Sequence, residues 1–146
     1  MFDYKRAFKK ANTDIAAIQM VPTVFHVRRG DVVLHPGNQR RYYPVSYYVK
    51  NMNSSKLSNP NHYVFLLTDD ARVINEAHEF FPDMNFKYFD RPRHNGSNNG
   101  TVWENQTPSR NPASEVIVLA AAFELAQECS AIVWSHPALP NICTIR

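Results

Sequence analysis

The chain has 146 residues, of which 44% are hydrophobic and 20% charged. A chain of this size and composition can bury a core of its own. This excludes three classes of protein: disordered chains, collagen-like chains and small proteins that depend on disulfides. Its formal net charge of +3 is too small to indicate a nucleic-acid partner, and we expect none. The longest apolar run, residues 116–123, is too short to cross a bilayer, and no apolar stretch follows the basic first ten residues. We therefore expect no membrane span, no signal peptide and no membrane contact by this segment.

Short apolar runs alternate with amphipathic stretches along the chain, a pattern typical of βαβ units. Residues 1–20 predict a helix with a basic face, and residues 21–146 predict one Rossmann-like domain. Runs rich in β-branched and aromatic residues predict buried, mostly parallel strands at 21–27, 63–67, 85–89 and 131–134. The third run alternates more strongly than the others, so we expect it nearer an edge of the sheet.

Three helices are expected between these strands. A proline or a capping side chain marks the start of each: Pro44 before 45–52, Asp69 or Asp70 before 71–81, and Ser114 before 115–128. The last of these helices contains the almost continuously apolar run. We therefore expect it to be covered on both sides.

These elements predict a three-layer α/β fold with a mostly parallel, Rossmann-like sheet. In open sheets of this kind, ligands bind outside the carboxyl ends of the strands. The expected site is therefore made by the loops that follow Val27, Leu67, Phe89 and Trp134. The third of these loops belongs to residues 90–112, which are rich in Asn, Gly and Pro without any period and are expected to be functional.

Two arginines stand at the end of the first predicted strand, in His26-Val-Arg-Arg-Gly-Asp31. Successive residues of a strand point to opposite sides, so one of Arg28 and Arg29 can reach a phosphate while the other pairs with a carboxylate, for which Asp31 is the local candidate. A purely structural Arg–Asp pair at the strand end is the alternative. The sequence contains no Gly-rich phosphate loop, so any phosphate would be held by side chains.

Neither the cysteines nor the histidines have the spacing of metal ligands, and we expect no metal site. Cys129 and Cys143 are expected to pack in the interior. The N-x-S/T sequons are more frequent than the numbers of Asn, Ser and Thr give by chance, and they lie at Asn53, Asn95, Asn99 and Asn105. Their excess favours a protein of the secretory pathway that carries glycan on the long loop.

The segment His26 to Asp31 resembles the V-H-V-R-R-x-D motif of the alpha-1,6-fucosyltransferase family, which is related to the alpha-1,2- and protein O-fucosyltransferases. Further downstream, Tyr42-Tyr-Pro-Val-Ser-Tyr-Tyr48 is similar to the family's F-H-P-I-E-E-Y, and Leu66-Leu-Thr-Asp-Asp70 to its L-A-T-D-D. Residues 123–127 and 131–135 resemble the helix, strand and serine loop that close the family's nucleotide pocket. Order and spacing are kept over residues 21–146.

The resemblance implies the C-terminal, donor-binding half of a GT-B glycosyltransferase. Such an enzyme is an inverting, metal-independent fucosyltransferase that uses GDP-fucose as its donor and needs no other cofactor. The implied acceptor is a glycan or glycoprotein of the N-glycan core type, and the implied location of the full-length parent is the Golgi lumen.

The resemblance also assigns site residues. Arg28 would hold the donor's β-phosphate and, together with Asp31, would be catalytic. His26 would lie by the guanine or ribose, while Arg29 and Asp31 would order the loop. Further donor-binding positions of the family match Arg29, Tyr48, Asp69, Asp70 and Ser135.

Several positions depart from the family pattern. Val32 and Pro36 replace its Lys and Glu, and its guanine-reading Asp aligns near Ala121, which leaves Glu115 and Glu124 as candidate base-reading acids. A non-catalytic nucleotide- or glycan-binding relic of the fold is therefore the alternative to an enzyme. We also expect the isolated chain not to transfer fucose, because the family's other half helps to orient the acceptor. An RNA-binding module has little support, since the arginines cluster at one edge of the sheet.

Overall fold

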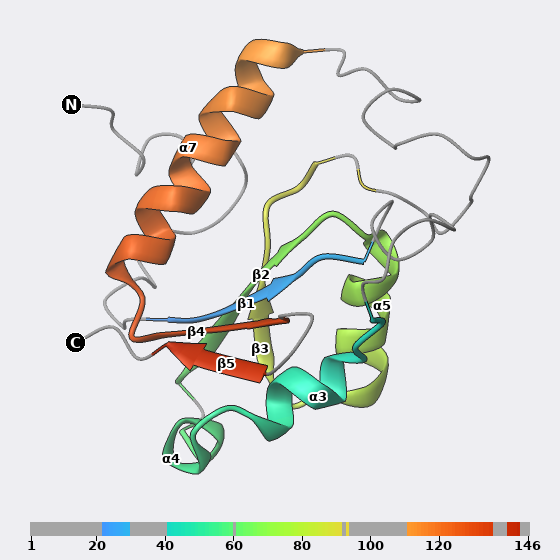
Figure 1. Cartoon of the computed structure of the whole chain (residues 1–146), viewed down its shortest axis with the longest axis vertical. Helices are drawn as coiled ribbons and strands as arrows, with labels where there is room; N and C mark the ends of the chain where they lie inside the picture. Colours follow the sequence, from blue (N-terminus) through green and yellow to red (C-terminus); the bar gives the residue numbers. More distant parts are fainter. Residues whose placement is uncertain are drawn as a thin grey trace.

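The computed structural model of the chain describes residues 22–29, 41–59, 61–91, 93, 111–135 and 140–143. These residues form a three-layer α/β fold in which a twisted sheet carries helices on both faces (Figure 1). The expected helix at 1–20 and most of the expected loop at 90–112 lie outside the described residues.

Within the described ranges of the chain, the sheet has five strands in the order β3-β2-β1-β4-β5. They are β1 (Thr23–Val27), β2 (Tyr63–Thr68), β3 (Asn85–Lys87), β4 (Ala131–Ser135) and β5 (Pro140–Cys143). The first four pair in parallel, which confirms the predicted strands and the mostly parallel, Rossmann-like class, with β3 at one edge as expected. β5 pairs antiparallel with β4 at the other edge and was not predicted. It is short and starts with a proline, which is tolerated at the first residue of a strand and weakens the sequence signal.

The helices are α3 (Val45–Lys50), the single turn α4 (Ser54–Leu57), α5 (Ala71–Phe80) and α7 (Pro112–Glu128). Pro44 is the capping residue of α3 and not part of its first turn. Asp70 caps α5 by accepting a hydrogen bond from Arg72 N at 2.9 Å, which confirms one of the two predicted caps.

The predicted start of α7 at residue 115, with Ser114 as its cap, was wrong. The helix begins at Pro112, and the side chain of Asn111 caps it by accepting from Ser114 N at 3.1 Å. Proline is favoured in the first helical position because its missing N–H would have no partner there. Ser114 therefore lies inside the first turn, where its backbone N–H is the group that is capped.

Alternation along β1 divides the core between the two faces of the sheet. Phe25 and Val27 belong to a cluster with the buried residues of α3 and α5. Val24 belongs to a second cluster with Ala122 and Leu125 of α7. α3 connects β1 to β2 on one face, whereas α7 connects β3 to β4 on the other. The direction of the connections thus changes between β1 and β4, and this is the switch point at which open α/β sheets bind ligands.

The expectation that α7 is covered on both sides was wrong. Its small residues face the sheet, but Val116 is 66% exposed, Phe123 59% and Leu119 47%. An unbroken apolar run is compatible with two kinds of helix. One is packed between two layers, and the other has one side against the sheet and a second side along a cavity. In the described part of the chain, no helix combines the length and the apolar character that a membrane span needs.

Candidate functional site

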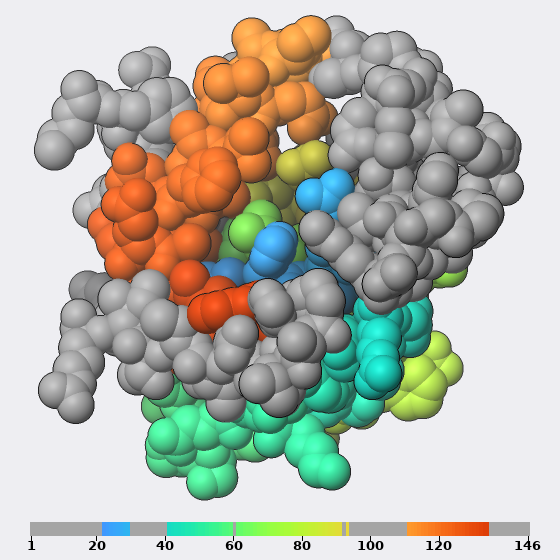
Figure 2. Space-filling view, in the orientation of Figure 1, coloured from blue at the N-terminus to red at the C-terminus, as the bar shows by residue number. Residues whose placement is uncertain are grey.

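A cavity of about 680 Å³ lies outside the carboxyl ends of β1, β2 and β4 and against α7. Figure 2 shows the hollow beside the orange helix, with blue and green atoms of the first two strands at its floor. This position agrees with the edge of the sheet at which the sequence predicts a site. It is also the switch point of the sheet, where the loops of neighbouring strands diverge and leave a crevice.

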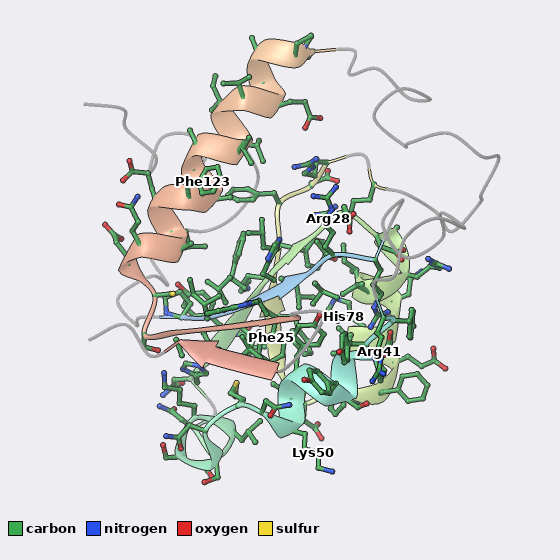
Figure 3. The ribbon with its side chains drawn as sticks, in the orientation of Figure 1. Phe25, Arg28, Arg41, Lys50, His78 and Phe123 are labelled. Atoms are coloured by element: carbon green, nitrogen blue, oxygen red, sulfur yellow. The ribbon has the colours of Figure 1, made fainter. Side chains whose placement is uncertain are left out.

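Most of the described lining residues are apolar, and they come from two sides. The sheet contributes His26, Leu67 and Trp134, which are register partners on neighbouring strands, with His26 between the other two. Facing them, α7 contributes Leu119, Ala122, Phe123 and Ala126. Phe123 projects from α7 toward the end of β1, where Arg28 lies (Figure 3). A flat ligand in the cavity would contact the rings of His26 and Trp134 on one side and the apolar side chains of α7 on the other.

The charged groups of the cavity come from the ends of adjacent strands. Arg28 follows β1, Asp69 follows β2, and Arg91 follows β3. The Arg28 Nε lies 3.7 Å from Asp69 Oδ2, and these side chains are 42% and 24% exposed. Asp69 Oδ1 also accepts a hydrogen bond from the backbone N of Arg29 at 3.0 Å. Asp69 therefore ties the end of β1 to the end of β2 and orients the Arg28 side chain.

Arg29 points to the opposite face and is 1% exposed. Its guanidinium donates to Tyr43 O at 2.8 Å and to Glu76 Oε2 at 2.5 Å. The other oxygen of Glu76 accepts from Val45 N, the first residue of α3, at 2.6 Å. Arg29 and Glu76 thus join the end of β1 to α3 and α5. The two arginines face opposite sides of the sheet, as strand alternation predicts, and Arg29 has Glu76 as a carboxylate partner. Asp31, the local candidate for that partner, lies outside the described residues.

Arg91 belongs to the same cavity, although the sequence analysis did not single it out as a ligand. Its Nε lies 3.7 Å from Glu115 Oε2, in the first turn of α7, and has no hydrogen-bond partner although it is buried. Glu115, expected as a base-reading acid, is therefore the partner of an arginine. The available signal was that Arg91 follows Phe89, in one of the predicted site loops.

Tyr48, Asp70 and Glu124 lie away from the described lining of the cavity. Tyr48 is 1% exposed and packs its ring 5.8 Å from that of Phe25, on the face of α3 and α5. Asp70 is fully buried, and its carboxylate caps α5 and holds the side chain of Arg72 at 2.6 Å. This hydrogen bond raises the pKa of Arg72. Glu124 lies on α7 outside the lining, and Ser135 ends β4 at the same edge of the sheet as the cavity.

Leu119 was missed, and Phe123 and Trp134 were expected at a nucleotide pocket only as parts of the segments 123–127 and 131–135, because their side chains offer neither a charge nor a catalytic group. Leu119 and Phe123 belong to the apolar run of α7, which was interpreted as core. Trp134 was interpreted as the end of a strand. It becomes part of the site only because β4 pairs with β1 and places it beside His26. Among the described residues, no cluster of three or more His, Cys, Asp or Glu could hold a metal ion.

No protein-family model matches the sequence, and no curated protein shows a significant match to it.

Proposed function

We propose that this chain binds a nucleoside diphosphate sugar in the cavity beside α7 and is the donor-binding part of a fucosyltransferase-like glycosyltransferase. The observation that carries the proposal is the position of Arg28, an exposed guanidinium at the mouth of an apolar cavity at the switch point of a Rossmann-like sheet. The resemblance of the segment from His26 to Asp31 to the fucosyltransferase motif makes GDP-fucose the proposed donor.

In this proposal Arg28 is the phosphate ligand. A guanidinium matches two oxygens of a phosphate at once and is always charged. Its side chain is 42% exposed and lines the cavity, so an anion in the cavity can reach the guanidinium. Breaking the bond between the sugar and the diphosphate develops negative charge on the leaving phosphate. A positioned guanidinium stabilises that charge without a metal ion.

The apolar part of the cavity would hold the nucleoside. The base would pack between Phe123 of α7 and the row formed by His26 and Trp134. This arrangement supplies stacking area and excludes water, as nucleotide pockets commonly do. The acceptor would be a glycan or glycoprotein, positioned by a further part of a Golgi enzyme as the resemblance implies.

A second candidate, a non-catalytic nucleotide-binding relic of the fold, is favoured by one observation. Asp69 is the one carboxylate among the described residues of the cavity lining, and it is engaged by Arg28 and by the backbone of Arg29. A general base needs a carboxylate within reach of the acceptor hydroxyl and free to take its proton. In the relic, donor binding persists and transfer does not occur.

The test is calorimetric titration of the purified chain with GDP-fucose, GDP and UDP. We expect GDP and GDP-fucose to bind, and Arg28→Ala to weaken both by about 1.5–3 kcal/mol, the range for a hydrogen bond to a charged group. Arg28→Lys should also bind more weakly, because it loses the planar fork. Arg41→Ala is the matched control, since Arg41 is exposed and is not among the lining residues. Equal affinities of wild type and Arg28→Ala would place the site elsewhere, and fucose transfer to an N-glycan by the chain would exclude the relic.

A further inference from the structure

We propose that Arg91 is a second phosphate ligand of the same cavity, so that the diphosphate is held between two arginines from different strands. This inference rests on the proposed function and deepens it. It assigns a role to a residue that lies outside the motifs from which the donor site was predicted.

The order of the strands places Arg28 and Arg91 on the two sides of the loop that follows β2. They follow β1 and β3, which are separated in the sheet by β2 alone, and Asp69 follows β2 between them. All three side chains line the cavity of about 680 Å³. A ligand that enters this cavity therefore meets guanidinium groups from both sides of the carboxylate.

The Arg91 guanidinium has an unmet hydrogen bond. Its Nε is buried and has no hydrogen-bond partner, and the carboxylate oxygen Oε2 of Glu115 lies 3.7 Å away. Leaving a buried N–H of a charged group without an acceptor is unfavourable. A phosphate oxygen in the cavity would be an acceptor of the right charge.

The spacing of its ion pair separates Arg91 from the structural arginines. Arg29–Glu76 and Arg72–Asp70 are tight pairs at 2.5 and 2.6 Å, and neither arginine is among the described lining residues of the cavity. Arg91–Glu115 is wide, at 3.7 Å, and Arg91 lines the cavity.

So wide an ion pair orients the guanidinium of Arg91. It also leaves the N–H groups able to donate to an anion that fits them better. We infer that Glu115 holds Arg91 beside the first turn of α7 until the phosphate binds. In that case Glu115 is a positioning residue, and its own charge is not needed for binding.

The experiment compares GDP with guanosine on three variants of the chain. We expect Arg91→Ala to weaken GDP at least about tenfold, which corresponds to the loss of one hydrogen bond to a charged group. Its affinity for guanosine, which has no phosphate, should stay within twofold of wild type. Arg91→Lys should bind GDP with intermediate affinity. Glu115→Gln should bind GDP as tightly as wild type or more tightly, because it releases Arg91 toward the phosphate.

A purely structural role of Arg91 predicts a different set of results. If Arg91 only anchors α7 through Glu115, then Glu115→Gln weakens GDP as Arg91→Ala does, and guanosine is weakened as well. Either result overturns the inference, provided that thermal unfolding shows both variants folded. If Arg28→Ala weakens GDP and Arg91→Ala does not, the inference alone fails. If wild type binds neither GDP nor guanosine, the proposed function fails with it.

Discussion

Removing the Glu76 carboxylate, which α5 contributes to the end of β1, should lower the free energy of unfolding. Arg29 is 1% exposed and Glu76 16%, so Glu76→Ala would leave a buried guanidinium without its counter-charge. It would also leave Val45 N, at the start of α3, without its acceptor. Breaking one partner of a buried ion pair costs about 3–5 kcal/mol, a large part of the roughly 5–15 kcal/mol that stabilises a domain.

Urea unfolding followed by circular dichroism measures this loss directly. Glu76→Gln keeps an oxygen for Val45 N but removes the charge, so its loss of unfolding free energy should be smaller than that of Glu76→Ala. Glu79→Ala is the matched control, because Glu79 lies on the same helix and is exposed. We expect it to change the free energy of unfolding by no more than about 0.5 kcal/mol. If Glu76→Ala and Glu79→Ala were equally stable, the ion pair between Arg29 and Glu76 would not hold the end of β1.

Two further predictions concern a buried histidine and the apolar wall of the cavity. Two effects lower the pKa of His62 below its ordinary value of 6.5: burial is the larger one, and the positive charge of Lys56 is the smaller. The stability that neutral His62 contributes is therefore complete above that pH and is lost as the pH falls through the lowered pKa. Unfolding at pH 7 and pH 5 should show that His62→Gln reduces this loss, and an unchanged loss would contradict the assignment. Phe123→Ala should weaken GDP in calorimetry by roughly 1–3 kcal/mol without lowering stability, because the ring is 59% exposed and lines the cavity. The control Val116→Ala removes a side chain that is 66% exposed and outside the lining, and it should leave GDP binding unchanged.

Local sequence signals predicted most of the elements. The strands β1 to β4 are short apolar runs with β-branched residues, and their ends fall within two residues of the predictions. The cap at Asp70 was readable because an aspartate followed a buried run and preceded an amphipathic one. The start of α7 was misplaced because Asn111 and Ser114 are both good capping residues, and Pro112 between them decided which one caps.

The sequence also predicted the edge of the sheet that carries the cavity. Parallel strands place all their carboxyl ends together, so the residues after Val27, Leu67 and Phe89 had to meet there. Alternation along β1 likewise required Arg28 and Arg29 to face opposite sides. These are consequences of backbone geometry over a few residues, and they hold wherever the rest of the chain lies.

What the sequence alone determined is therefore local: the elements, the common edge, and one arginine for each face of the sheet. The tertiary structure decided the partners. Glu76 lies 47 positions from Arg29, and Glu115 reaches Arg91 only because the first turn of α7 lies beside the segment that follows β3. The order of the strands decided that Trp134 stands next to His26. Such contacts depend on which helix covers which face, and apolar periodicity cannot distinguish a buried side of α7 from the wall of a binding cavity, because both require the same residues.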